Sequence, residues 1–327
     1  MTSAKSKPLI SIVTPVFNEE EALFKYKERL FKAIEPLEKD FSFEFILTDN
    51  DSTDGSWKIL EDFARADKRF KIFKLSRNFG YQKSIWTGYC KSTGDAVIEF
   101  DCDLQDPPEL LPVFLEKWEK GSKVVYGVRQ KRNEKFLQTR QVVDLPFVRP
   151  LFYFILRKMS AIDIPVNAGD FMLLDRKIVN ILTSINDHNI YLRGTVFSLG
   201  FSRSAVHYSR ESRKYGTTKF IFQKSLKLAL DGIISQSALP LKFASIFGIL
   251  ASVVTLLLCG FYLGAKIFTD AVLPDGFTTL VVLTLFGISV NGLFLGIIGE
   301  YLGRIYDQQK SRPITLIEKE LNTGEND

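Results

Sequence analysis

The chain has 327 residues, 46% of them hydrophobic, and a formal net charge of +5 at pH 7. This length allows one sizeable globular domain with further elements beside it. The basic excess is modest and no nucleic-acid-binding motif accompanies it, so the composition argues against a nucleic-acid partner and for attraction to a membrane surface. Three cysteines without a regular spacing argue against a disulfide framework, and residues 1–8 contain no apolar stretch that would predict a signal peptide.

Apolar runs and amphipathic runs alternate along the first part of the chain. The predicted strands are residues 9–17, 43–48, 70–75, 97–100 and 124–128. The predicted helices are residues 18–38, 57–66, 81–91 and 109–120. Strands that alternate with helices form parallel βαβ units, so we predict a Rossmann-like α/β domain with a mostly parallel sheet and helices on both faces.

Acidic residues follow three of these strands. Asp101 and Asp103 come directly after the fourth strand, and if that strand ends near Phe100 their carboxylates can aim at one point. Glu19 follows the first strand and Asp49 the second, and ligands of such sheets bind beyond the carboxyl ends of the strands. Mg²⁺ is usually held by one or two carboxylates together with waters and substrate phosphates. The pattern therefore predicts a site for a divalent metal and a phosphate-bearing ligand.

Beyond residue 129 the alternation weakens. Residues 148–159 and 221–239 each mix apolar and basic positions, which is typical of an amphipathic helix at a membrane interface. An ordinary helix that faces a protein core would show the same pattern, and the sequence leaves that alternative open.

Two long uncharged runs, residues 243–265 and 276–299, occupy the last third of the chain. Each exceeds the roughly 20 residues that a helix needs to cross a bilayer, and two such runs in succession favour transmembrane helices over buried core helices. No ionisable residue interrupts them, which argues against a transporter or a channel. Small residues about one turn apart in the second run favour close helix packing or self-association, so we expect a homo-oligomer. These residues are Gly292, Gly296, Gly299 and Gly303.

The charges around the two runs predict their orientation. The connector, residues 266–275, carries one lysine and two aspartates, whereas basic residues cluster before the first run and after the second. The positive-inside rule then places the N-terminal domain and both termini in the cytosol, as in a multi-pass protein of the cell (inner) membrane. The predicted division is a cytosolic domain at 1–220 with an interfacial helix at about 146–160, a juxtamembrane helix at 221–242, transmembrane helices at about 243–266 and 276–300 within 243–303, and a cytosolic tail at 304–327.

Short motifs are spread over nearly the whole chain. They are Val13-Thr-Pro-Val-Phe-Asn-Glu-Glu20, the turn after Asp49, Leu75-Ser-Arg-Asn-Phe-Gly80, Asp101-Cys-Asp-Leu-Gln-Asp-Pro-Pro108, Ala168-Gly-Asp-Phe-Met-Leu-Leu174, Arg213-Lys-Tyr-Gly-Thr-Thr-Lys219 and Gly299-Glu-Tyr-Leu-Gly-Arg-Ile-Tyr306. Together they resemble the polyprenyl-phosphate glycosyltransferases of family 2, an inverting group that contains dolichol-phosphate mannose synthase and bactoprenol glucosyltransferases. The two-span tail resembles the bacterial glucosyltransferase branch. The resemblance implies a GT-A fold for the N-terminal domain.

The resemblance also implies a set of site residues. Contacts to the nucleotide sugar are implied for Pro15, Phe17, Glu19, Asp49, Asp101 and Arg129. Ligation of Mg²⁺ or Mn²⁺ is implied for Asp101, Asp103 and Gln105. Contacts to the acceptor phosphate are implied for Arg213, Lys219 and Arg140. Catalytic roles are implied for Asp103, Asp170 and Arg129.

Two details stay open in this assignment. Relatives usually have Asp-Gly where this chain has Asn50-Asp51, and a non-glycine residue at position 51 is less permissive of a positive φ, which leaves the geometry of that turn open. The second is Asp170, because an acceptor phosphate with a second pKa near 6 is largely deprotonated at neutral pH and needs little help from a base. Asp170 is then either a base, a residue that positions sugar or acceptor, or a structural cap.

The sequence therefore predicts a metal-dependent, inverting glycosyltransferase. A sugar, which we expect to be glucose, passes from a UDP-sugar to undecaprenyl or dolichyl phosphate at the cytosolic membrane face and leaves UDP. One alternative is a processive polysaccharide synthase, which typically carries a Gln-x-x-Arg-Trp motif, whereas this chain has no tryptophan after Trp118. Another is a non-catalytic membrane scaffold, against which the intact Asp101, Asp103 and Arg129 argue. The sequence does not identify the sugar.

Overall fold

The computed structural model describes residues 7–129, 165, 168–185, 187, 190–209, 276–310 and 312–323, together with isolated positions between 241 and 257. The chain divides into two compact units. The first, here called the sheet unit, comprises Met1–Arg149, Ile162–Ile221 and Arg312–Asp327. The second, the helix unit, comprises Pro150–Ala161 and Phe222–Ser311.

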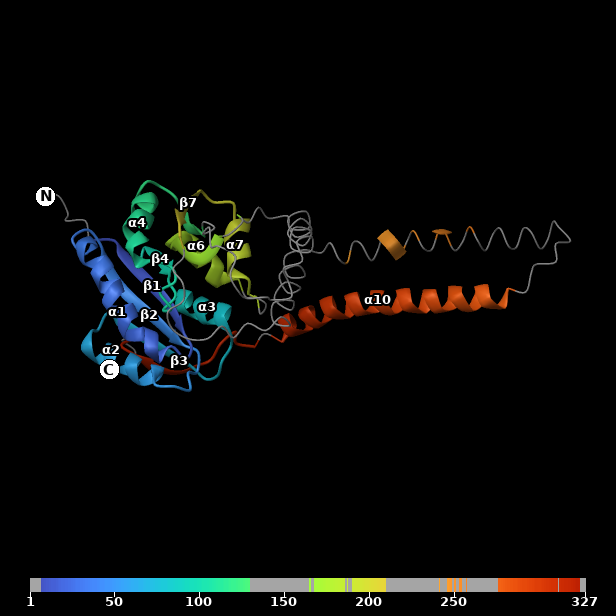
Figure 1. The fold of residues 1–327 in the computed structure, drawn as a ribbon, viewed down its shortest axis with the longest axis horizontal. Coiled ribbons are helices and arrows are strands. Elements are labelled where there is room, and N and C mark those ends of the chain that lie inside the picture. The colour runs from blue at the N-terminus through green and yellow to red at the C-terminus, as the bar shows by residue number, and fades with distance from the viewer. Residues whose placement is uncertain are drawn as a thin grey trace, which may run out of the picture. The chain divides into compact units, whose positions relative to one another are not determined.

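Within the described residues, an eight-stranded sheet forms the centre of the sheet unit (Figure 1). In spatial order its strands are β7 (Arg203–Tyr208), β5 (Val124–Arg129), β6 (Ala168–Asp175), β4 (Ala96–Glu99), β1 (Leu9–Val16), β2 (Ser42–Asp49), β3 (Phe70–Leu75) and β8 (Ile317–Leu321). Strands β1 to β5 and β7 run in one direction, and β6 and β8 run against them. The predicted α/β fold with a mostly parallel sheet is therefore confirmed. We call the edge where the parallel strands end the carboxyl edge, and the opposite one the amino edge.

Helices cover both faces of this sheet, each over its own apolar core. On one face the core includes side chains from α1 (Glu20–Ile34), α2 (Ser56–Ala66) and α4 (Leu111–Glu119), with the short 3₁₀ turns η1 (Glu35–Leu37) and η2 (Pro108–Leu110) beside them. On the other face it includes side chains from α3 (Tyr81–Lys91), α6 (Arg176–Ser184) and α7 (Leu192–Ser198). Alternate residues of β4 enter the two cores, Ala96 and Ile98 on one side and Val97 on the other, as the period of a strand requires.

Helix α3 lies unusually close to the sheet. A Cβ atom placed on Gly88 would come within 2.3 Å of a methyl group of Val13 on β1, so only glycine permits this approach. The close packing fixes the first residue of α3, Tyr81, next to the carboxyl edge, where its hydroxyl contacts Asp101.

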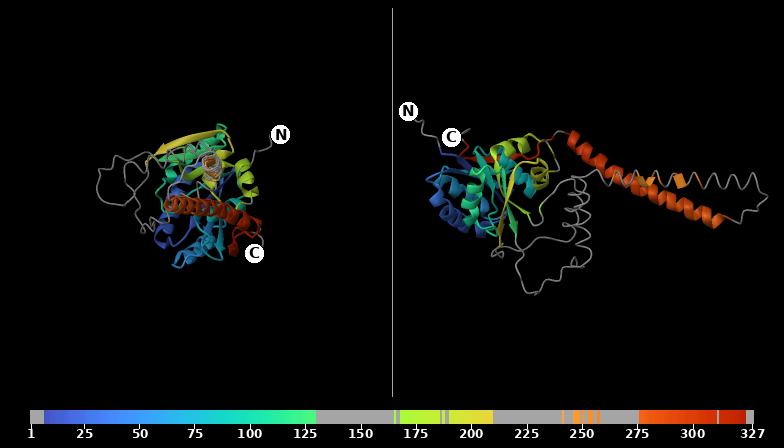
Figure 2. Two further views of the ribbon diagram at one scale, coloured as in Figure 1. Left: turned by 90° about the vertical axis from the view of Figure 1, so that its right-hand side faces the viewer. Right: turned by 90° about the horizontal axis from the view of Figure 1, so that it is seen from above.

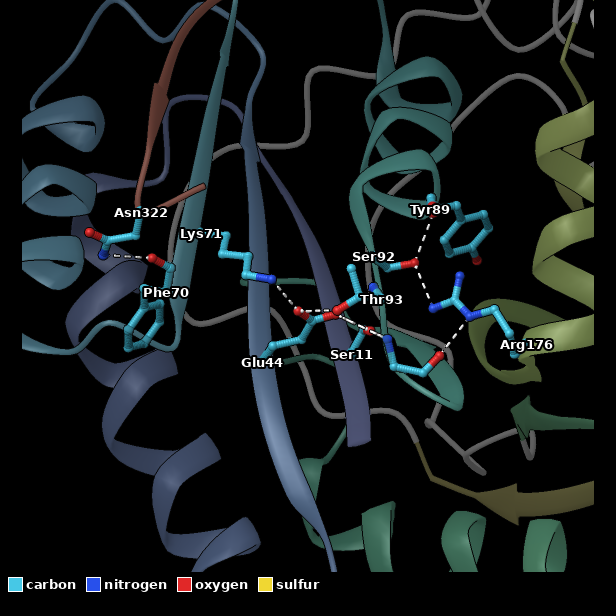
Figure 3. Close-up of polar contacts among 10 residues, drawn as sticks. Ser11, Glu44, Phe70, Lys71, Tyr89, Ser92, Thr93, Arg176 and Asn322 are labelled. Atoms are coloured by element: carbon cyan, nitrogen blue, oxygen red, sulfur yellow. Dashed lines mark hydrogen bonds and ion pairs between the residues drawn. The ribbon is translucent and has the colours of Figure 1, made fainter. Parts of the chain in front are cut away.

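At the amino edge, polar side chains tie the loop before β4 to its neighbours (Figure 3). Arg176, the first residue of α6, donates to the backbone oxygen of Gly94 at 2.6 Å and to the hydroxyl of Ser92 at 3.2 Å. These bonds connect α6 to the loop that leads into β4.

Several elements of the sheet unit were not predicted. Between residues 168 and 208, where the sequence pattern weakens, the structure has β6, α6, α7 and β7. The C-terminal strand β8 was not predicted either; it pairs antiparallel with β3 (Figures 1 and 2, red). Asn322 secures its end by donating to the backbone oxygens of Ala64 and Phe70, at 2.7 and 2.9 Å.

In the helix unit, α10 (Phe277–Gln309) is a continuous helix (Figure 2, orange). No helix in the described part of the chain has both the length and the apolar character needed to cross a membrane. The predicted second span, 276–300, lies in α10, and most of the predicted first span, 243–266, lies outside the described residues. The predicted helix at 146–160 lies outside them too, as does 221–242 apart from residue 241. These membrane elements stay predictions.

Candidate active site

Three loops at the carboxyl edge hold a strained residue each. Asn18 after β1, Asp51 after β2 and Leu104 after β4 have φ angles of 54°, 62° and 55°. Non-glycine residues in this left-handed region cost on the order of 1 kcal/mol or more each, and such residues cluster at active sites and ligand clamps. Asp51 therefore takes the positive φ that its side chain disfavours, which settles the open question about this turn.

Hydrogen bonds link the loops after β1 and β2. The side-chain oxygen of Asn18 accepts from the backbone N–H of Thr53 at 2.8 Å, and the N–H of Asn18 donates to the hydroxyl of Ser52 at 3.0 Å. The N–H of Glu19 donates to the hydroxyl of Ser56 at 2.9 Å. These contacts hold the two loops as one surface and help to offset the backbone strain.

The four residues predicted only for the nucleotide sugar lie on or next to these loops. Pro15 belongs to β1 and is buried, Phe17 is 37% exposed, and Glu19 occupies the N-cap position of α1. Asp49, the last residue of β2, is fully buried and accepts from the N–H of Ser52. Burial raises the pKa of Asp49, and the bonds from Ser52 partly counter this. The structure thus brings the four residues to one end of adjacent strands.

Asp101 and Asp103 lie just beyond β4, as the sequence predicted. Burial and the neighbouring Asp103 carboxylate raise the pKa of Asp101 to about 7. The backbone N–H of Gln105 donates to Asp103 at 3.0 Å and shapes the loop around the positive φ of Leu104. The negative charges of Asp101 and Asp103 repel each other, so a cation bound by both carboxylates would stabilise the pair.

A third carboxyl, Glu99, is linked to Asp101 through the Tyr81 hydroxyl, and the sequence pattern did not single it out. Glu99 ends β4 and is 1% exposed. The Tyr81 hydroxyl lies 3.0 Å from Oε1 of Glu99 and 2.9 Å from Oδ1 of Asp101, while Oε2 of Glu99 has no hydrogen-bond partner among the described residues. Burial, followed by the charges of Asp101 and Asp170, raises the pKa of Glu99 well above its usual range. Because Tyr81 has a single hydroxyl hydrogen, it can satisfy the two carboxyl oxygens only in part.

Arg129 ends β5 at the same edge. Its guanidinium donates to the Tyr208 hydroxyl and to the Asp106 carboxylate, each at 3.3 Å, and Tyr208 also bonds Asp106. A Cβ atom on Gly169 of β6 would lie only 3.0 Å from Nη2 of Arg129, so the guanidinium packs directly on this glycine. Arg129 is thus a fixed positive charge beside the acidic loop.

Asp170 follows Gly169 and forms an ion pair. Arg193 on α7 donates to both carboxylate oxygens of Asp170, at 3.2 and 2.8 Å. The structure therefore places Asp170 near the carboxyl edge, and it adds a partner that no sequence pattern indicated.

The three residues predicted for the acceptor phosphate, Arg140, Arg213 and Lys219, lie outside the described residues. Within the described ranges, no group of three or more histidine, cysteine or acidic residues could by itself hold a metal ion. The donor set at Asp101 and Asp103 nevertheless fits Mg²⁺ or Mn²⁺, because these ions accept one or two carboxylates and complete their shell with phosphate oxygens and water. The buried Oε2 of Glu99, without a hydrogen-bond partner among the described residues, is a further oxygen close to this pair.

Comparison with known proteins places this arrangement in a family context. The model of the family described as "Glycosyl transferase family 2" matches residues 11–182. The chain is 40% identical to the "Uncharacterized glycosyltransferase YkcC" of Bacillus subtilis, over 94% of this chain and 93% of that protein. It is 33% identical to the bactoprenol glucosyl transferase of Shigella phage SfX, over 94% and 98%. It is 34% identical to the prophage bactoprenol glucosyl transferase homolog of Escherichia coli, over 95% and 98%.

Solved structures show a weaker similarity. Glucosyl-3-phosphoglycerate synthase from Mycobacterium tuberculosis, in complex with Mg²⁺ and UDP, aligns with a TM-score of 0.44 at 17% identity, over 72% of this chain and 81% of that one.

Proposed function

Since this chain belongs to glycosyl transferase family 2, with near full-length similarity to bactoprenol glucosyltransferases, we propose that its carboxyl edge transfers a hexose from a UDP-sugar to a polyprenyl phosphate. The observation that carries the proposal is the pair Asp101 and Asp103, held at the tip of β4 beside the fixed cation of Arg129. Glucose is the proposed sugar, because it is the one in the relatives' names, and undecaprenyl or dolichyl phosphate is the proposed acceptor.

The donor is proposed to bind across the loops after β1, β2 and β4. Pro15, Phe17, Glu19 and Asp49 would receive the nucleoside, and the diphosphate would then point to Asp101 and Asp103. A divalent cation, Mg²⁺ or Mn²⁺, held by these two carboxylates with Gln105, would offset the charge of the leaving diphosphate.

The reaction exchanges one bond to the anomeric carbon for another. An oxygen of the acceptor phosphate forms the new bond to carbon 1 of the sugar, and the bond from carbon 1 to the diphosphate breaks, so that UDP leaves with the bonding electron pair. Attack from the face opposite the leaving group inverts the anomeric carbon. Arg129, already oriented by Asp106 and Tyr208, would stabilise phosphate charge by charge-assisted hydrogen bonds.

No general base is required by this scheme. A phosphate monoester with a second pKa near 6 is mostly a dianion at neutral pH and attacks without losing a proton to the protein. Both oxygens of Asp170 already accept hydrogen bonds from Arg193, which supports a positioning role for this carboxylate rather than a basic one.

We propose that the protein acts at the cytosolic face of the cell (inner) membrane, with two transmembrane helices and both termini in the cytosol. The support lies in the uncharged runs 243–265 and 276–299, in the basic residues that flank them, and in exposed apolar side chains of α10 such as Leu283, Phe286 and Leu295. The small residues Gly292, Gly296, Gly299 and Gly303 on α10, with open space beside each of them, support a homo-oligomer.

The test uses the purified full-length chain in lipid vesicles that contain undecaprenyl phosphate. UDP-glucose, UDP-galactose and GDP-mannose are supplied in turn, with Mg²⁺ or with EDTA, and the lipid products are identified by mass spectrometry. We expect one lipid-linked monosaccharide from UDP-glucose in Mg²⁺ and none in EDTA. A polymer would favour a processive synthase, and UDP binding without any product would favour a scaffold.

A further inference from the structure

The ion pair between Arg193 and Asp170 has a forked geometry. Nε of Arg193 lies 3.2 Å from Oδ1 of Asp170 and Nη2 lies 2.8 Å from Oδ2, and the two side chains are only 27% and 21% exposed. Two parallel bonds between planar groups fix the orientation of both, which a single contact does not. Asp170 therefore holds the guanidinium of Arg193 in one plane.

The ion pair with Asp170 does not use all of the N–H donors of Arg193. A guanidinium carries five N–H donors and no acceptor, and the two bonds to Asp170 use two of them. Among the described residues, no other acceptor binds Arg193. A half-buried cation with spare, oriented donors is a ready site for an anion.

Arg193 also lies near enough to Arg129, the other arginine of the site, for the two charges to interact. Arg129 packs on Gly169 and Arg193 binds Asp170, and because consecutive residues of a strand face opposite sides of the sheet, the two guanidiniums approach the start of β6 from its two faces at the carboxyl edge. Burial by itself would lower the pKa of Arg193; the Asp170 carboxylate outweighs this and raises it, while the charge of Arg129 opposes the rise. An anion bound at the carboxyl edge near both arginines would relieve this repulsion, and a phosphate has enough oxygens to accept from both.

We propose that Arg193 binds a phosphate group of a substrate together with Arg129, and that Asp170 is the positioning residue that orients Arg193. The proposal rests on the proposed function, since it assigns a role within the same transfer reaction. The phosphate belongs either to the polyprenyl acceptor or to the nucleotide donor, and these two sources give different results below. A merely structural pair, which would only fasten α7 to β6, gives a third.

The variants are Arg193→Ala, Arg193→Lys and Asp170→Asn, with Lys123→Ala as the matched control. Lys123 forms an ion pair with Asp175, with Nζ 2.8 Å from Oδ2, at the other end of the same strand β6 and away from the carboxyl edge. For each variant we would measure the KM for undecaprenyl phosphate, the KM for UDP-glucose, the affinity for UDP in the presence of Mn²⁺, and the melting temperature.

Arg193→Ala is expected to weaken the binding of one substrate by roughly ten- to hundredfold, the usual effect of losing a hydrogen bond to a charged group. A raised KM for undecaprenyl phosphate with unchanged UDP affinity assigns Arg193 to the acceptor, whereas a loss of UDP affinity assigns it to the donor. Arg193→Lys keeps the charge without the fork and should recover part of the loss. Asp170→Asn should move the same parameter in the same direction, by a smaller factor.

The proposal is overturned if Arg193→Ala lowers the melting temperature as Lys123→Ala does but leaves both KM values and UDP affinity unchanged. If Arg193→Ala does not fold, Arg193→Lys with unchanged substrate parameters overturns it equally. A wild-type protein without any transfer activity would instead contradict the proposed function. In that case direct binding of UDP and of vesicles containing undecaprenyl phosphate, compared between wild type and Arg193→Lys, still decides whether Arg193 binds phosphate.

Discussion

Two buried glutamates at opposite edges of the sheet show how differently the fold treats the same side chain. At the amino edge, Glu44 on β2 is 4% exposed and accepts hydrogen bonds from Lys71, from the Ser11 hydroxyl, and from Thr93 and Gly94 (Figure 3). Burial by itself would raise the pKa of Glu44, but these donors outweigh it and hold the pKa below its usual range.

Glu99 at the carboxyl edge is as deeply buried as Glu44 but has far fewer hydrogen-bond donors around it. Its one contact is the Tyr81 hydroxyl, its second oxygen has no partner among the described residues, and the charges around it are those of Asp101 and Asp170. The contacts at the amino edge thus stabilise a buried carboxylate, whereas those at the carboxyl edge leave carboxyl groups that a positively charged ligand would stabilise. Changes at the first should alter folding, and changes at the second should alter activity.

The largest expected effect is on activity, at the carboxyl edge. Asp103→Ala should lower turnover by roughly a thousandfold, because the loss of a ligand forfeits several kcal/mol of charge stabilisation on the leaving diphosphate. Its melting temperature should equal or exceed that of wild type, since one of two mutually repelling carboxylates is gone. Turnover with UDP-glucose and thermal unfolding of the same preparation measure both. Turnover within tenfold of wild type would remove Asp103 from the metal site.

The next effect is on stability, at the amino edge. Glu44→Gln should lower the free energy of unfolding by about 2–3 kcal/mol at pH 7, because Lys71 loses its buried partner while remaining partly solvated. Denaturant unfolding of wild type and variant gives this difference, and turnover of the folded variant should stay near the wild-type value. A variant as stable as wild type would contradict the structural role.

The same pair of proteins gives a pH test. The folded-state pKa of Glu44 is lowered from its usual 4.5, so its contribution to stability is fully present above that pH and is lost as the pH falls through the folded-state pKa. The difference in unfolding free energy between wild type and Glu44→Gln should be constant from about pH 6 to 8 and shrink below about pH 4.5. A difference in unfolding free energy that grew toward acid pH would contradict a lowered pKa of Glu44 in the folded state.

Glu99→Gln should change stability least among buried positions, by less than about 1 kcal/mol, since the amide keeps one acceptor for Tyr81 and no cation is left unpaired. This is the direct counterpart of Glu44→Gln, measured by the same denaturant unfolding. A loss as large as that of Glu44→Gln would erase the distinction between the two edges.

The smallest effect concerns the edge strand β8. Glu320 bonds Lys91 at 3.0 Å, with side chains 27% and 34% exposed, and Glu320→Ala should cost about 0.5 kcal/mol, as for other partly solvated ion pairs. Thermal unfolding would show a small shift with unchanged turnover. A loss above about 2 kcal/mol would mean that β8 depends on this pair.

The sequence was sufficient where local pattern and chain order determine the structure. The βαβ alternation up to residue 129 predicted strands and helices close to their observed bounds, and the shared carboxyl edge followed from parallel strands, which placed Asp49 and Asp101 correctly. Beyond that point β6 runs antiparallel between β4 and β5, and its pairing depends on residues far away in the chain, so no local pattern indicated it.

The site residues that the sequence analysis missed depend on tertiary contacts. Arg193 is an unremarkable arginine on a short helix, and its partner Asp170 lies on a different element, so nothing local marks the pair. Asp106, which orients Arg129, lay inside a motif already noted but had no assigned role. Glu99 did leave a signal, because a carboxylate that ends an otherwise apolar strand is rarely buried without a reason.

The central claim is that the carboxyl edge binds a nucleoside diphosphate through a divalent cation held by Asp101 and Asp103. Calorimetric titration of UDP into the purified full-length protein, in Mn²⁺ and in EDTA, tests it most directly, with Asp103→Ala and Glu44→Gln measured alongside. The account predicts binding in Mn²⁺ that weakens at least about tenfold in EDTA and in Asp103→Ala, with Glu44→Gln unchanged. Equal UDP affinity with and without the metal, or full affinity in Asp103→Ala, would contradict it.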